Sequence, residues 1–182
     1  NLSDYVKRRN GVPLGHSNSL RNMLIRSLGA GKFSIFWQYW NPIWGFYLGK
    51  YIFKPLKLIL PQALSLIITF VVCGFIHDLA IMLLKWKFFL LLTPWFLFMG
   101  LGVILSDYAK IDYSKFPWIV RAVITYHHIR LPISCLSNKN QKQSGVAKMN
   151  KLITTTCIYN CLESDYLQNS EGILSCIFLF AT

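Results

Sequence analysis

Two long apolar runs dominate the pattern of hydrophobic and polar positions along this chain of 182 residues. In residues 58–84 the only acidic, basic or histidine side chains are His77 and Asp78. A helix of this length measures about 40 Å, enough to cross a hydrocarbon layer of about 30 Å. Residues 88–106 follow after a short basic turn and contain no charged side chain. The pattern predicts two transmembrane helices that form a hairpin.

Aromatic side chains concentrate in residues 33–53, just before the first apolar run. Trp and Tyr prefer the level of the lipid headgroups because each carries a polar tip on an apolar body. We therefore expect interfacial helices here, with a break at Pro42, which has no N–H to donate. Residues 1–32 are polar and basic, so we expect a juxtamembrane loop facing the cytoplasm, with one helical turn at residues 20–28.

The C-terminal part of the chain has a less regular pattern. Residues 116–131 are amphipathic and aromatic, but too interrupted for a membrane span. From residue 132 to residue 182 the chain is polar at first and has no clear period, which indicates a poorly ordered tail. The expected organisation is a basic loop (1–32), a membrane core (33–131) and this tail. The fold class predicted is all-α, a multi-pass integral membrane protein, and because the chain begins with Asn1 we expect it to be a fragment.

Composition and charge support a membrane environment. Hydrophobic residues make up 54% of the chain and aromatic residues 15%, a balance that favours the bilayer over a water-soluble domain. Of the nineteen Lys and Arg residues, nine lie at or before Lys57, against one acid, Asp4. Such a flank favours an anionic lipid surface or an acidic ligand. The cations flank apolar segments, so nucleic-acid binding is not expected, and the five cysteines show no disulfide or zinc spacing.

His77 is the first candidate for chemistry, because a histidine accepts a proton at neutral pH and this one lies inside an apolar run. One helical turn before it are Cys73 and Gly74, and one turn after it are Ala80 and Ile81. Several of these neighbours are small and leave room for a ligand or for another helix. The alternative is a structural histidine that bonds to a neighbouring helix.

Three other ionisable side chains carry weaker signals. Asp78 lies about 100° around the helix from His77, so we expect it to pair with a Lys or Arg elsewhere or to face water. His127 and His128 are adjacent and do not share a helix face, and no third ligand lies at a useful spacing. A metal site is therefore not expected.

Asn41 is the second candidate, an amide at a point where a helix is expected to stop. It lies between Trp40 and Pro42, and its side chain offers both a donor and an acceptor to a polar ligand. The alternative is a cap on the end of a helix. For Trp37 and Trp40 the alternative to a binding role is an aromatic belt at the membrane interface.

The order of these elements resembles the membrane-bound O-acyltransferase family. The family's pattern is an aromatic motif ending in His or Asn, then an aromatic element with Pro and Leu, and later a histidine in an apolar helix after a glycine. The matching residues are Phe36, Trp37, Trp40 and Asn41, then Tyr51, Ile52, Phe53, Pro55 and Leu56, then Gly74 and His77. The separation of 36 residues between the two polar positions is also similar to that of the family. The resemblance covers residues 32–107.

The resemblance implies an acyltransferase that moves an acyl group from a thioester to a hydroxyl. His77 would be the general base, and Asn41 would orient the acceptor or hold the thioester carbonyl. Trp37, Trp40 and Tyr51 would bind substrate. The implied donor is acyl-coenzyme A, a co-substrate, with no further cofactor. The acceptor would be a hydroxyl of a lipid, a polysaccharide or a protein.

Two other interpretations stay open at this point. The chain could be a catalytically silent fragment that keeps the membrane fold of the family. It could also be a non-enzymatic membrane hairpin, a subunit in which His77 and Asp78 contact a helix of a partner protein.

Overall fold

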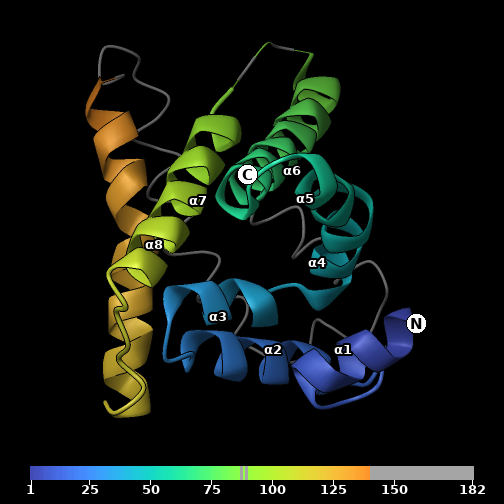
Figure 1. The fold of residues 1–182 in the computed structure, drawn as a ribbon, viewed down its shortest axis with the longest axis vertical. Helices are drawn as coiled ribbons and strands as arrows, with labels where there is room; N and C mark the ends of the chain where they lie inside the picture. The colour runs from blue at the N-terminus through green and yellow to red at the C-terminus, as the bar shows by residue number, and fades with distance from the viewer. Residues whose placement is uncertain (87, 89, 140–182) are drawn as a thin grey trace.

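The computed structural model describes residues 1–86, 88 and 90–139, and the regular structure in this part of the chain is helical. In chain order the elements are α1 (Leu2–Asn10), α2 (Ser19–Leu28), α3 (Phe33–Tyr39), α4 (Pro42–Leu48), the π-helical segment η1 (Gly49–Phe53), α5 (Lys54–Ile59), α6 (Gln62–Lys85), α7 (Leu92–Tyr108) and α8 (Trp118–Lys139) (Figure 1). The all-α prediction is confirmed for these residues.

The helices form two sets that cross each other (Figure 1). One set consists of α6, α7 and α8, which lie side by side with α7 antiparallel to both neighbours. The other consists of α1, α2 and α3, which run across one end of the first set. Between them, α4, η1 and α5 form a curved segment beside α6, which we call the arch (residues 42–59).

Within the described residues, α6 is the one helix long and apolar enough to cross a membrane, over Gln62–Leu83. It begins at Gln62 and not at residue 58, as the sequence pattern suggested, because of Pro61. Proline pushes the residue before it into an extended conformation, and Leu60 has φ −127° and ψ 153°. This break leaves Leu58 in α5, on the arch.

The second apolar run forms a shorter helix than expected. α7 has 17 residues, which corresponds to about 26 Å, less than a hydrocarbon layer of about 30 Å. It begins at Leu92, four residues after the start of the predicted crossing (88–106). The run is therefore an apolar helix packed antiparallel to α6.

The N-terminal segment contains two helices where a loop with one helical turn, at residues 20–28, was expected. α1 begins with a cap, because the N–H of Asp4 donates to Asn1 Oδ1 at 3.0 Å. It ends at Gly11, whose φ of 83° is the left-handed conformation common at helix C-termini. The expected loop is thus wrong for α1, whereas α2 forms where a helical turn at residues 20–28 was expected. The polar sequence of residues 1–10 gave little sign of α1, whose two ends are capped by Asn1 and Gly11.

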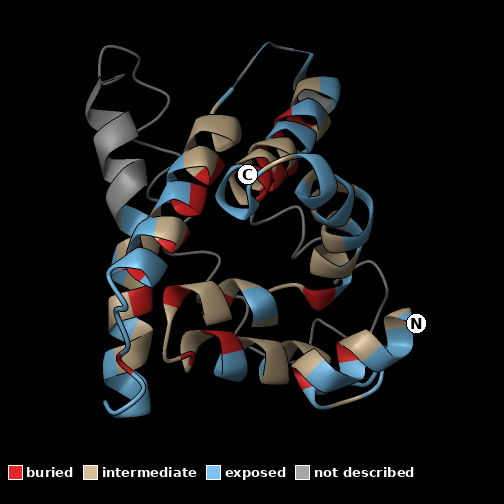
Figure 2. Ribbon diagram, viewed as in Figure 1, coloured by how far each residue is buried: buried red, intermediate tan, exposed pale blue. Residues whose placement is uncertain are grey.

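A cluster of buried side chains joins α3 to α7. Figure 2 shows buried positions along the ribbon of both helices. Phe33 and Phe36 on α3 pack with Met99 and Val103 on α7, and each of the four exposes 3% of its surface or less. The aromatic segment is therefore partly a core element, not only a surface belt. This packing fixes the position of the tryptophans that follow.

α8 runs past residue 132, where the sequence pattern placed the start of a poorly ordered or atypical tail. Residues 132–139 continue the helix, and residues 140–182, the rest of the expected tail, lie outside the described part. The start of α8 is tied to α2, because Trp118 Nε1 donates to the carbonyl oxygen of Ile25 at 3.0 Å.

Candidate active site

The imidazole of His77 on α6 is the centre of the candidate site. Its Nδ1 lies 2.7 Å from the carbonyl oxygen of Cys73, one helical turn earlier. A carbonyl oxygen can only accept a hydrogen bond, so Nδ1 carries a proton, and in the neutral ring the lone pair is on Nε2. None of the described residues forms a hydrogen bond with Nε2. The half-buried ring therefore presents a proton acceptor.

Two aromatic rings from other helices enclose this imidazole. Trp44 of α4 packs edge-on against it, with 5.7 Å between the ring centroids, and Phe96 of α7 lies at 5.5 Å. The indole Nε1 of Trp44 also donates to the sulfur of Cys73 at 3.1 Å. Three helices thus meet around His77, and apolar surface covers much of the ring.

Asn41 is the N-cap of α4. It adopts the left-handed conformation, with φ 39° and ψ 71°, which Asn tolerates better than most residues. Its Oδ1 accepts a hydrogen bond from the N–H of Trp44 at 3.2 Å, and Pro42 follows at the first helical position. The structure thus shows the capping role for Oδ1. The side-chain Nδ2 donates to no residue in the described part of the chain.

Trp44 connects the two polar candidates. The backbone N–H of Trp44 donates to the side chain of Asn41, while the indole of Trp44 packs on His77. No hydrogen bond joins Asn41 to His77 within the described residues. Asn41 and His77, which are 36 positions apart in the sequence, therefore both contact Trp44, one at its backbone and the other at its side chain.

The other expected site residues lie at different distances from this centre. Trp37 packs against Phe96 at 5.9 Å, so it shares a neighbour with His77. Trp40 stacks on Phe36 at 5.5 Å and belongs to the α3 core. Tyr51 is 63% exposed and stacks on another tyrosine of the arch. Trp37 is thus in the second layer around the imidazole, and Tyr51 lies outside it.

Asp78 contradicts its sequence prediction. It is fully buried, so it does not face water, and it forms no ion pair with a cation of the described residues. Its Oδ1 accepts from the N–H of Leu91 at 3.2 Å and of Leu92 at 2.9 Å, and its Oδ2 accepts from the N–H and the hydroxyl of Thr93, both at 2.7 Å. The first N–H groups of a helix have no partner within it and carry partial positive charge. The Asp78 carboxylate on α6 therefore caps α7.

Gly74 allows the close approach that this cap requires. A Cβ atom at this position would lie 2.8 Å from the carbonyl oxygen of Leu92 and 2.8 Å from Cα of Thr93. These are backbone atoms, which cannot move aside as a flexible side chain can. The glycine is needed for the contact between α6 and the start of α7, one turn away from His77.

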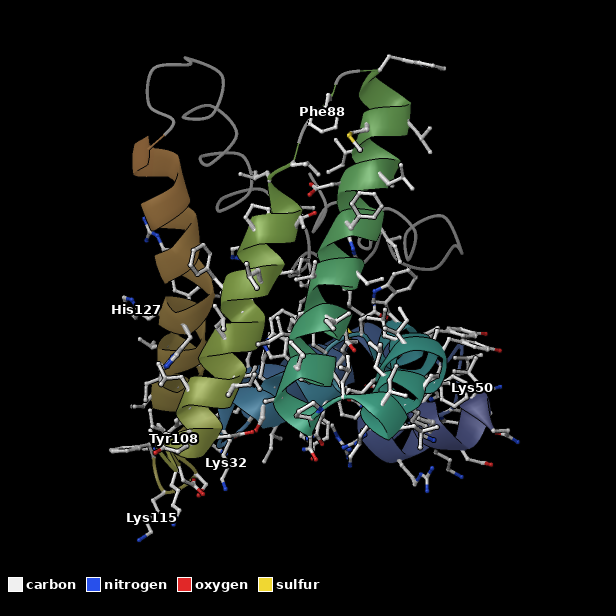
Figure 3. All side chains as sticks on the ribbon, turned by 45° about the horizontal axis from the view of Figure 1, so that its top comes forward. Lys32, Lys50, Phe88, Tyr108, Lys115 and His127 are labelled. Carbon is white, nitrogen blue, oxygen red and sulfur yellow. The ribbon has the colours of Figure 1, made fainter. Side chains whose placement is uncertain are left out.

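The histidines of α8 take no part in this site. His128 donates through Nδ1 to the carbonyl oxygen of Ile124, 2.8 Å away, and its ring stacks on Phe33. His127 lies on the outer side of α8 (Figure 3). The described residues contain no group of three His, Cys, Asp or Glu side chains that could hold a metal ion.

Sequence reasoning missed two of the groups around the imidazole. Trp44 had a signal, because the N–H three positions after an N-cap is the usual partner of the cap, and that position follows Asn41 by three. Phe96 had no such signal, because it lies on α7 and nothing in the order of residues places it near His77 on α6.

Fold and site define, for the described part of the chain, an all-α protein with one candidate membrane-spanning helix, α6, which carries a histidine whose Nδ1 bonds to the helix backbone. No family model, curated protein or solved structure matches the chain. Function is therefore argued from the residues of the site.

Proposed function

We propose that this chain carries the catalytic centre of a membrane-embedded O-acyltransferase, with His77 as general base. The observation that carries the proposal is the bond from His77 Nδ1 to the carbonyl oxygen of Cys73. It fixes the tautomer in which Nε2 can take a proton from an attacking hydroxyl. The order of the sequence motifs supports acyl transfer as the reaction.

In the proposed reaction the acceptor hydroxyl attacks the carbonyl carbon of an acyl thioester, such as acyl-coenzyme A. The hydroxyl proton moves to Nε2 of His77 as the new C–O bond forms. The tetrahedral intermediate then collapses, the C–S bond breaks, and the imidazolium returns the proton to the departing thiolate. Electrons and protons balance without any further reactant.

Asn41 supplies a hydrogen-bond donor in this scheme. Its Oδ1 is used by the cap on α4, which leaves the two N–H bonds of Nδ2 for the thioester oxygen or the acceptor. A donor that meets a developing oxyanion contributes about 3 kcal/mol in comparable sites. Trp44 and Phe96, packed on the imidazole, limit the access of water.

Apolar surface on both helices of the hairpin supports placing them in a bilayer, as a multi-pass core. On α6, Phe75 and Leu83 expose 47% and 63% of their surface, and on α7 Leu101 and Leu105 expose 43% and 67%. Large apolar patches left uncovered on a chain favour contact with lipid or with other apolar helices. In this arrangement the acceptor and the acyl chain reach His77 from within the membrane.

The test of the base uses His77→Asn, because the Asn amide can still donate to the Cys73 carbonyl but has no basic nitrogen. Thiol release would be measured from acetyl- and palmitoyl-coenzyme A by the full chain in nanodiscs, with diacylglycerol, oligosaccharide or serine-peptide acceptors. We expect a loss of at least a hundredfold. The matched control is His128→Asn, which removes a histidine with the same backbone contact and should leave the rate within about twofold.

Undiminished thiol release by the His77→Asn protein, or an equal loss in the control, would exclude His77 as the base. If the wild-type chain releases no thiol with any of these acceptors, the enzymatic proposal itself fails.

The donor role of Asn41 is separated from its capping role by two substitutions. Asn41→Asp keeps an N-cap oxygen and tolerates the left-handed conformation, but it has no N–H donor. We expect it to fold with wild-type stability and to lose about a hundredfold in rate. Asn41→Ala should lose the cap as well, at about 1 kcal/mol. Equal rates for wild type and Asn41→Asp would restrict Asn41 to the cap.

A further inference from the structure

Three lysines surround one hollow on the arch. The hollow has a volume of about 530 Å³ and is lined by Lys50, Lys54, Pro55, Lys57 and Leu58. Figure 3 shows Lys50 at the outer edge of the molecule, far from His127 on α8. None of the lining residues contacts the imidazole of His77 or caps α7, so this is a second surface, distinct from the candidate active site.

The charge of this hollow is not neutralised by the described part of the chain. No acidic residue occurs between Asp4 and Asp78 in the sequence, and Asp78 is occupied by the N-terminus of α7. None of the three lysines forms an ion pair with the described acidic side chains. Lys50 lies 5.0 Å from the ring centroid of Tyr51, a contact that leaves its charge in place. Three like charges around one hollow favour a bound anion.

Exposed apolar side chains continue the surface next to the lysines. Leu58 is 87% exposed and Ile59 is 77% exposed, both on α5. A small soluble anion would neutralise the lysines and leave these side chains in water. A lipid satisfies both features, because its phosphate contacts the cations while its acyl chains cover the apolar surface.

The position of the hollow in the chain agrees with a headgroup site. α5 ends at Ile59, and the candidate membrane-spanning helix begins at Gln62. Lys57 is therefore only five residues before the span, where the polar layer of a bilayer would lie.

We propose that the hollow formed by Lys50, Lys54 and Lys57 binds the phosphate headgroup of an anionic phospholipid, with Leu58 and Ile59 against its acyl chains. The site holds the arch at the membrane surface. This inference does not rest on acyl transfer, so it can stand or fall independently of the proposed reaction.

The test compares phosphatidylglycerol with phosphatidylcholine, as radiolabelled lipids bound at equilibrium to the full chain in a neutral detergent. We expect about a hundredfold tighter binding of phosphatidylglycerol. The triple variant Lys50→Gln, Lys54→Gln and Lys57→Gln should lose this preference, at about fivefold for each lysine. The control variant Lys7→Gln, Lys110→Gln and Lys115→Gln makes the same change in net charge at exposed positions and should bind within about twofold of wild type.

Three results would overturn the proposal. Equal binding of the two lipids would remove the headgroup site, and an equal loss in the control variant would assign binding to net charge alone. Displacement of the lipid by free coenzyme A at micromolar concentration would assign the hollow to a soluble polyphosphate. Should the triple variant fail to fold, the three single variants test the same point, each with an expected loss of about fivefold.

Discussion

The charged group of Asp78 is buried in the hairpin of α6 and α7, whereas the charged lysines of the arch are exposed. In the hairpin, Asp78 is fully buried and accepts four hydrogen bonds from the start of α7. In the arch, Lys50, Lys54 and Lys57 line an open hollow and have no acidic partner among the described residues. A buried charge must be satisfied within the fold, because no water reaches it, whereas an exposed charge can be satisfied by solvent or by a partner. We therefore infer that the charge of Asp78 stabilises the fold, whereas the charges of the three arch lysines are available to bind a partner.

The largest expected effect on stability comes from Asp78→Asn, which acts on the buried side of this comparison. The amide replaces one acceptor oxygen with a donor that faces the N–H or hydroxyl of Thr93. We expect a loss of about 3 kcal/mol in the free energy of unfolding, because a buried group is left without a partner and the charge at the start of α7 is lost. Denaturant unfolding in detergent micelles, followed by tryptophan fluorescence, measures it.

The control is Asp107→Asn, an exposed aspartate whose Oδ1 accepts from the hydroxyl of Ser34 at 2.8 Å. This bond is open to solvent, so the change in stability should stay below about 1 kcal/mol. If both variants lose the same amount, burial is not what makes the Asp78 cap important.

A smaller effect is expected from Gly74→Ala, which tests the close approach of the two helices at the same cap. The new methyl group would meet backbone atoms of α7 at 2.8 Å, so the helices must separate. We expect a loss of about 2 kcal/mol, typical of an overpacked contact. Gly49→Ala in the arch is the matched control, because a Cβ atom there has nothing within 4 Å, and this variant should be as stable as wild type or more stable. Circular dichroism during thermal unfolding compares the two.

The smallest effect on stability is expected in the arch itself. Lys50→Gln, Lys54→Gln and Lys57→Gln together should change the free energy of unfolding by less than about 0.5 kcal/mol in lipid-free detergent, since exposed cations without acidic partners contribute little to folding. A marked loss of stability would mean that these lysines have a structural role after all, and the contrast with Asp78 would no longer hold.

Much of the fold was predictable because it depends on local pattern. The first apolar run formed α6, and Pro61 moved its start from residue 58 to Gln62 by a rule that applies to any residue before proline. The second run formed α7, but 17 residues made it shorter than a crossing. In the basic N-terminal segment, a helical turn was predicted at residues 20–28, where α2 forms, but α1 was not predicted, since its caps leave little trace in hydrophobic periodicity.

The candidate site was predictable only in part. His77 and Asn41 were singled out because a polar group in an apolar run and an amide before a proline are unusual. Trp44, which joins them, and the role of Asp78 were not foreseen. Helical spacing correctly placed Asp78 away from the imidazole, but it could not show which backbone N–H groups would meet the carboxylate.

The sequence by itself determined the helical class, the apolar helix beside the basic aromatic segment, and the residues with unusual chemistry, because each of these depends on composition and on spacing within one helix. The tertiary structure alone decided which ring nitrogen of His77 is free, which rings enclose it, and that Asp78 caps α7. Those outcomes depend on contacts between helices, and such contacts are fixed by packing in three dimensions rather than by the order of residues in one segment.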